Sequence, residues 1–262
     1  MRRPDRWESA PAWRAHWSAL APEPGTRKLG TMTNGATKQV LLSWSSGKDS
    51  AWSLHTLRAT PGVEVVGLFT SLNETHDRVA MHAVRRTLLE AQAAAADLPL
   101  RIARIPYPCS NERYEEVMAA ELLWMRTQGI QAMAFGDLFL EDIRAYREKN
   151  LDGSGLEPLF PLWGRDTKSL AQEMMAGGLK ARLTCVDPNQ VSVELAGRTW
   201  DDALLADLPE AADPCGENGE FHTFVWDGPM FQHPVGVTGG ERVERDGFVF
   251  QDLLPESEQS AS

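Results

Sequence analysis

Residues 40–58 read VLLSWSSGKDSAWSLHTLR and combine three kinds of local structure in one short segment. The apolar run at 40–42 is typical of a buried strand, and the polar loop SWSSGKDS follows it directly. From Ala51 onward the apolar side chains recur at helical spacing, and Pro61-Gly62 ends that pattern. The sequence therefore predicts a strand, a serine-rich loop and a helix in immediate succession.

The same alternation continues as far as residue 135. Further buried strands are predicted at 63–69, 100–105 and 130–135, and helices at 76–96 and 111–127. Strands that alternate with helices favour a parallel sheet covered on both faces. We therefore expect an α/β fold with a doubly wound, mostly parallel sheet, whose ligands bind beyond the carboxyl ends of the strands.

After Gly155 the pattern becomes mixed. It predicts a helix at 170–176, a strand at 180–186 and a strand-rich segment at 223–250, with turns at Asp227-Gly228 and Gly239-Gly240. We expect one α/β domain over residues 39–150 and a smaller, mixed C-terminal region over residues 151–262.

Residues 1–38 differ from the rest of the chain. They contain Pro4, Pro11, Pro22 and Pro24 and lack a sustained apolar period, which predicts a flexible N-terminal extension. Its tryptophans at 7, 13 and 17 leave open a short helix that docks on the body of the protein. Met32 stands just before the first strand and is an alternative start.

Composition is that of an ordinary globular protein, with 42% hydrophobic and 24% charged residues. No apolar run approaches the roughly 18 residues of a membrane span, and the N-terminus has no apolar signal core. The net charge of −11 makes nucleic acid an unlikely partner, because affinity for phosphates is driven by Lys and Arg. Three separated cysteines without a CxxC pair indicate reduced thiols, so we expect a cytoplasmic protein.

The loop at 45–50, SSGKDS, has the properties of an anion site. The first turn of a helix leaves backbone N–H groups unpaired and carries partial positive charge, so phosphates bind there readily. Gly47 permits close approach of the backbone, and Lys48 adds a full charge. The Walker A pattern is absent, because it requires Gly at Leu42 and Ser or Thr at Asp49. A surface turn with a capping serine is the alternative interpretation.

SSGKDS resembles the SGGKDS loop of the PP-loop ATP pyrophosphatases, with Ser46 in place of the usual first glycine. Four further segments resemble the diphthine–ammonia ligase (diphthamide synthetase) family of that superfamily: MHAVRRTLLEAQAAAADLPL at 81–100, GDLFLEDIR at 136–144, LEPLFPLWGRDT at 156–167 and GENGEFHTFVWDGPMF at 216–231. The resemblance covers roughly residues 39–235. It implies a Rossmann-like (HUP-type) sheet of the adenine nucleotide alpha hydrolase-like superfamily.

The resemblance implies cleavage of ATP between the α- and β-phosphates and activation of a carboxylate as an adenylate, which ammonia converts to an amide. The acceptor, a carboxylate on a protein or small molecule, would bind the C-terminal region. Residues expected to bind the nucleotide are Ser45, Ser46, Gly47, Lys48, Asp49, Ser50, Thr70 and Gly136. Lys48 would neutralise the leaving pyrophosphate, because donors placed in advance stabilise charge that develops in the transition state.

Four carboxylates complete the candidate site. Asp49 and Asp137 are the expected Mg²⁺ ligands, although Asp49 could also serve as the acidic residue of a helix N-terminus and Asp137 as a loop cap. The resemblance assigns catalytic roles to Asp137, Glu217 and Glu220, and the glutamates could bind Mg²⁺ or position ammonia. His82 on the helix predicted at 76–96 is a weaker candidate, and so are His222 and Thr223.

Two other functions stay open at this point. An RNA-modifying PP-loop ATPase is disfavoured by the net charge and by the missing CxxC pair. A nucleotide-binding sensor without catalysis does not account for the carboxylates of GENGEF. Incubation with ATP tests the sensor, since only an enzyme forms AMP and pyrophosphate, whereas a salt-dependent shift with tRNA would support the RNA-modifying alternative.

Overall fold

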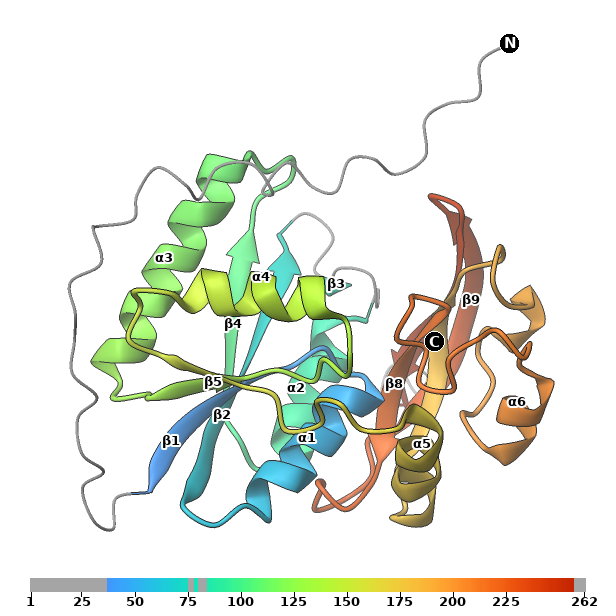
Figure 1. Cartoon of the computed structure of the whole chain (residues 1–262). Coiled ribbons are helices and arrows are strands. Elements are labelled where there is room, and N and C mark those ends of the chain that lie inside the picture. The colour runs from blue at the N-terminus through green and yellow to red at the C-terminus, as the bar shows by residue number, and fades with distance from the viewer. Residues whose placement is uncertain (1–36, 75–77, 80–83, 257–262) are drawn as a thin grey trace.

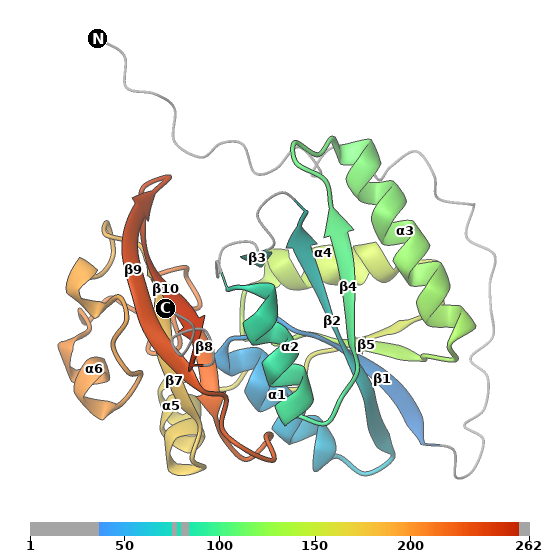
Figure 2. The same cartoon turned by 180° about the vertical axis from the view of Figure 1, so that it is seen from behind.

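The computed structural model describes residues 37–74, 78–79 and 84–256 (Figure 1). Nearly all of the extension predicted over residues 1–38 lies outside the described residues, and so does His82. The described chain forms a sheet of mostly parallel strands, flanked by helices, and a second, antiparallel sheet beside it (Figures 1 and 2). In the described part of the chain, no helix has the length and apolar character needed to span a bilayer.

The first sheet confirms the predicted α/β class. Its parallel strands are β1 (Lys38–Ser43), β2 (Val63–Asn73), β4 (Leu100–Ile105), β5 (Ala132–Ala134) and β6 (Glu157–Leu159). Their pairings place them in the order β4-β2-β1-β5-β6, and β3 (Arg78–Val79) adds antiparallel to the end of β2. The chain leaves β1 toward β2 on one side and later returns to β5 on the other side. The topological switch point, where such sheets bind ligands, therefore lies between β1 and β5.

The two faces of this sheet have separate hydrophobic cores, because successive side chains of a strand point to opposite faces. Val40 and Leu42 pack with α1 (Lys48–Arg58) and α2 (Arg86–Ala95). Leu41 belongs instead to the core beneath α3 (Asn111–Thr127) and α4 (Glu141–Leu151). This arrangement is the doubly wound one that the sequence predicts.

The second sheet has the strand order β8-β7-β10-β9 with antiparallel pairing throughout. The sheet is built from β7 (Lys180–Val186), β8 (Phe221–Asp227), β9 (Val237–Arg245) and β10 (Phe248–Pro255), and the same region holds α5 (Thr167–Ala176), η3 (Val193–Leu195) and α6 (Asp202–Asp207). Phe221 and Phe224 of β8 share one core with α1 and α2. In both views α1 lies between the two sheets (Figures 1 and 2).

Two predictions of local structure are wrong. The helix predicted at 76–96 begins only at Arg86, since Arg78 lies in β3 and bridges Arg85. Both arginines bind the carboxylate of Asp252 in β10, at 2.7 and 2.6 Å, so a distant partner holds these two residues outside the helix.

The predicted turn at Gly239-Gly240 lies inside β9. The chain reverses instead at Asp246-Gly247, where both residues have positive φ, 53° and 82°, as a two-residue hairpin of type I′ requires.

Candidate functional site

A cavity of about 550 Å³ opens at the carboxyl ends of β1, β2 and β5. Its walls include ten of the residues that the sequence singles out: Ser45, Lys48, Asp49, Ser50, Thr70, Gly136, Asp137, Glu217, His222 and Thr223. Ser46, Gly47 and Glu220 do not line it. The cavity has the size of a small-molecule site and lies at the switch point of the sheet.

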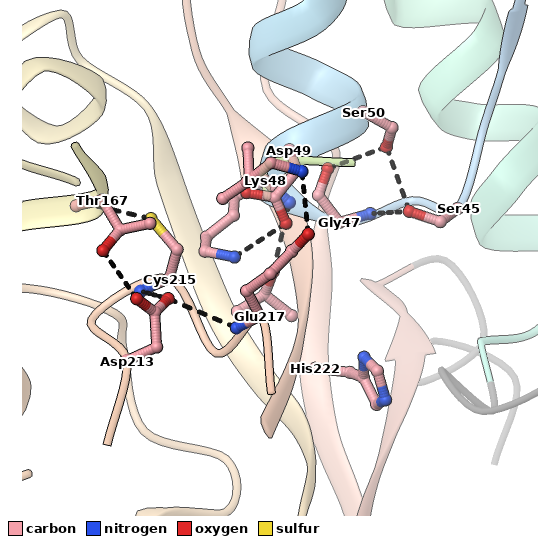
Figure 3. Close-up of polar contacts among 12 residues, drawn as sticks. Ser45, Gly47, Lys48, Asp49, Ser50, Thr167, Asp213, Cys215, Glu217 and His222 are labelled. Atoms are coloured by element: carbon pink, nitrogen blue, oxygen red, sulfur yellow. Dashed lines mark hydrogen bonds and ion pairs between the residues drawn. The ribbon is translucent and has the colours of Figure 1, made fainter. Parts of the chain in front are cut away.

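The loop between β1 and α1 is held by its own side chains and by β8. Gly47 is the N-cap of α1, and Ser50 Oγ donates to Gly47 O at 2.9 Å. Ser45 Oγ lies 3.2 Å from Ser50 Oγ and accepts from Gly47 N at 3.4 Å (Figure 3). Lys48 N donates to Thr223 Oγ1 of β8 at 3.1 Å. The second sheet therefore helps to shape the start of α1.

Close packing of β5 against this loop explains the glycine at 136. A Cβ on Gly136 would stand 3.0 Å from the carbonyl carbon of Asp49 and 3.0 Å from Ser50 N. The end of β5 thus touches the first turn of α1, and a side chain at residue 136 would have to displace the backbone of that turn.

Ser46 stands where the related loops have glycine, and its backbone explains that preference. Its φ of 74° lies in the left-handed region, which residues with a side chain rarely adopt. Its carbonyl oxygen accepts from Val225 N at 3.0 Å and from Gln92 Nε2 at 3.1 Å. Ser46 thus contributes backbone contacts that shape the loop, while its side chain is buried away from the cavity.

Lys48 is almost fully buried, and its Nζ lies 2.8 Å from Asp49 Oδ2. The ammonium also lies 5.7 Å from the ring centres of Trp200 and Phe221. Burial lowers the pKa of Lys48, but the carboxylate of Asp49 and further anionic groups outweigh that effect and raise the pKa above its usual value. Lys48 is therefore a permanent cation that links α1 to the second sheet.

The two carboxylate oxygens of Asp49 differ in their hydrogen bonding. Its Oδ2 binds Lys48, whereas Oδ1 is buried and has no hydrogen-bond partner among the described residues. Burial raises the pKa of the Asp49 carboxyl, against the opposing effect of Lys48. An unpaired carboxylate oxygen next to an anion-binding loop fits a cation that accompanies phosphates.

Glu217 reaches the cavity from the segment before β8, and its Oε1 accepts from Leu138 N at 2.8 Å. Burial raises the pKa of Glu217 to about 7, and the Leu138 N–H only partly offsets this effect. The Glu217 carboxyl can therefore take up or release a proton near neutral pH. Its own N–H donates to Asp213 Oδ1 at 3.3 Å (Figure 3).

Glu220 lies outside the cavity, although the sequence pairs it with Glu217. Its Oε1 accepts from Asp213 N at 2.7 Å and from Asn218 Nδ2 at 3.1 Å, so it fixes the turn that carries Glu217. Asp213 is the residue that sequence reasoning missed: Oδ1 accepts from Cys215 N and Glu217 N, and Oδ2 accepts from Thr167 Oγ1 at 2.6 Å. Its position four residues before Glu217, in a Pro-Gly-rich turn, is the only signal in the sequence.

Asp137 lines the cavity, and its Oδ2 accepts from Arg147 Nε of α4 at 3.3 Å. The cavity extends from here between α3 and α4, where its walls are mostly apolar and aromatic. The apolar and aromatic residues that line this half are Phe69, Tyr114, Met118, Leu122, Met133, Phe135, Leu140, Ile143, Tyr146 and Leu151, and Glu115, Arg147 and Asn150 line it as well. Thr70 also lines the cavity, but it lies within β2, which continues to Asn73 instead of ending at residue 69.

The donor set fits Mg²⁺ that is shared with a phosphate ligand. Among the described residues, no three His, Cys, Asp or Glu side chains gather into a complete metal site. Mg²⁺ bound with nucleotides takes only one or two carboxylates, together with phosphate oxygens and water. The unpaired Oδ1 of Asp49 suits this role, whereas Asp137 would have to share its carboxylate with Arg147.

The cysteines are free thiols in the structure. Cys215 lies beside the site, and its Sγ donates to Thr167 O at 3.4 Å (Figure 3). Burial raises its pKa to about 12, so the nucleophilic thiolate is scarce at neutral pH. The arrangement is that of a packed structural thiol.

Comparison with known proteins identifies the family of this chain. The model of the diphthamide synthase N-terminal domain matches residues 38–158, and that of the diphthamide synthase C-terminal domain matches residues 166–252. The diphthine–ammonia ligases of Rattus norvegicus and Homo sapiens are 25% and 26% identical to this chain, and each alignment covers 76% of the chain and 82% of the relative. The diphthine–ammonia ligase of Schizosaccharomyces pombe is 27% identical to this chain. That alignment covers 76% of this chain and 36% of the Schizosaccharomyces pombe protein. Because both domain models match in order, the chain belongs to the diphthamide synthase family.

Proposed function

We propose that this protein is an ATP-dependent ligase that forms an amide from a carboxylate and ammonia, with release of AMP and pyrophosphate. One observation carries the proposal: residues of the loop at 45–50, which has the character of an anion site, line the same cavity as Glu217. The Glu217 carboxyl can exchange a proton near neutral pH. The relatives are named diphthine–ammonia ligase, which points to a diphthine-like carboxylate as the acceptor.

In the first step, an oxygen of the acceptor carboxylate attacks the α-phosphorus of ATP. The bond between that phosphorus and the bridging oxygen to the β-phosphate breaks, and pyrophosphate leaves with the electron pair. The start of α1 would hold the pyrophosphate through the N–H groups of Asp49 and Ser50, because those of Gly47 and Lys48 donate to Ser45 Oγ and Thr223 Oγ1. Lys48 would offset the charge that builds on the leaving group, and the free oxygen of Asp49 would bind the accompanying Mg²⁺.

In the second step, ammonia attacks the carbonyl carbon of the acyl adenylate, and the bond to AMP breaks. The nitrogen loses a proton as the amide forms. Glu217 is suited to accept that proton, since its pKa of about 7 lets it ionise near neutral pH.

The two parts of the chain would divide these tasks. The part of the chain that forms the first sheet, which extends through β6 at Glu157–Leu159, would bind the nucleotide, with adenine near Thr70 and in the apolar half of the cavity. The part from α5 onward would supply Glu217 and hold the acceptor. Burial of α1 between the two sheets supports this division, because both parts then contact the reacting phosphate.

The test combines the purified chain with ATP, Mg²⁺, ¹⁵N-labelled ammonium and a diphthine-bearing protein or peptide. We expect AMP, pyrophosphate and one labelled amide nitrogen in equal amounts, each dependent on the acceptor. Formation of ADP and phosphate would contradict the proposed chemistry. Tight ATP binding without turnover across a panel of carboxylate acceptors would instead identify a nucleotide sensor.

A further inference from the structure

Gln92 of α2 is a fully buried polar residue, and both its amide oxygen and its amide nitrogen form hydrogen bonds. Its Oε1 accepts from Trp44 Nε1 at 2.9 Å. Its Nε2 donates to the carbonyl oxygens of Ser46 and Val225, at 3.1 and 2.6 Å. These three partners come from the end of β1, from the anion-binding loop and from β8.

The hydrogen-bonding chemistry of these partners allows only one orientation of the Gln92 amide, and very few other side chains could replace it at this position. An indole N–H only donates and a carbonyl only accepts, so the Gln92 oxygen must face Trp44 and its NH₂ group must face the two carbonyls. A glutamate here would set a carboxylate oxygen against two carbonyl oxygens. A methionine of similar length would leave the Trp44 N–H buried without a partner, which is costly.

The loop depends on these contacts because its conformation is strained. Ser46 has a φ of 74°, and such a backbone persists only where its surroundings fix it. The Ser46 carbonyl is fixed by the Gln92 amide and by Val225 N at 3.0 Å. Two residues earlier in β8, Thr223 accepts from Lys48 N, so Gln92 and β8 together hold both sides of Gly47.

We propose that Gln92 is a positioning residue that holds the loop at 45–50 in its phosphate-binding shape and couples that shape to the second sheet. The inference rests on the proposed function, since it assumes that this loop binds the phosphates of ATP. Gln92 does not itself line the cavity and acts through Ser46, through β8 and through Trp44, which does line it.

The experiment compares the affinities for ATP and for adenosine of the full chain and of Gln92→Met, by calorimetry well below the unfolding temperature of either protein. Leu89→Val is the matched control, because Leu89 is equally buried on α2 but lies in the apolar core. In Gln92→Met we expect a roughly tenfold weaker ATP affinity, the effect of about one buried hydrogen bond, and an adenosine affinity within about twofold of the parent. In Leu89→Val neither affinity should change.

Gln92→Glu provides a second readout that simple loss of stability does not give. At neutral pH its carboxylate should weaken ATP binding at least as much as methionine does. As the pH falls and the carboxyl gains a proton, the restored O–H donor should bring the ratio of variant to parent affinity back toward one. The ¹H–¹⁵N indole signal of Trp44 should move in both Gln92 variants and stay in place in Leu89→Val.

The outcomes separate the inference from the function on which it rests. If the parent chain binds ATP no better than adenosine, the proposed function fails. If the parent prefers ATP and Gln92→Met keeps that preference, or loses ATP and adenosine affinity equally, the positioning role is overturned while the proposed function stands.

Discussion

Replacement of Glu217 by glutamine tests how much the burial of an ionised carboxyl at this position destabilises the folded protein. Burial raises the pKa of Glu217 from its ordinary 4.5 to about 7, so the folded protein holds a proton that the unfolded chain has already lost. Stability therefore falls as the pH rises from about 4.5 to about 7. At about 1.36 kcal/mol per pKa unit the full penalty is about 3.4 kcal/mol. Because the side chain is partly exposed, solvent screening reduces the expected value to about 2 kcal/mol.

Glutamine keeps the shape of the residue and the oxygen that accepts from Leu138 N, but it carries no charge at any pH. Glu217→Gln should therefore match the parent near pH 4.5 and exceed its stability by about 2 kcal/mol above pH 7. Urea unfolding at closely spaced pH values measures this difference directly. A stability difference that stays constant from pH 5 to about 8 would refute the reasoning, because an uncharged or unburied Glu217 has no such pH dependence.

Three further changes address the loop. Lys48→Ala should lower the rate of pyrophosphate release by about 10²–10³-fold, the scale of a lost donor to developing charge, and release at the parent rate would exclude Lys48 from that role. Ser46→Gly should raise the free energy of unfolding by about 1 kcal/mol in thermal or urea denaturation, because glycine adopts φ near 74° without strain; a loss of stability would show that the serine side chain matters. Gly136→Ala should weaken ATP binding while leaving the circular dichroism spectrum intact, since its Cβ would press on the backbone of Asp49 and Ser50 at 3.0 Å; unchanged ATP affinity would mean that the loop yields freely.

Local patterns predicted the elements whose stability is local or whose apolar period is strong. The strand at 100–105, the helix at 111–127 and the strand at 180–186 have the predicted bounds. The helix α4 was not predicted, because its sequence EDIRAYREKNL is mostly polar and only Leu151 is fully buried. The pattern of the segment at 76–96 is helical, but Arg78 lies in β3 and Arg85 has an extended backbone, and both residues are ion-paired to Asp252.

The hairpin at 246–247 was missed although its signal is present. Asp-Gly between alternating strands is a strong indicator of a two-residue turn, whereas Gly239-Gly240 only resembles one. Glycine supplies conformational freedom in both places, and pairing with β10 keeps β9 extended through Gly239 and Gly240.

The sequence by itself determined the strand–loop–helix unit around Gly47, the α/β class and the family, because these depend on residues that are neighbours in the chain. Only the tertiary structure decided which of the two glutamates, Glu217 or Glu220, lines the cavity. Glu217 enters the cavity and Glu220 fixes the turn behind it, a difference set by Asp213 and by the N–H of Leu138. The pKa of a carboxyl and the partners of Gln92 depend on groups brought together across the fold, and no spacing along the chain encodes them.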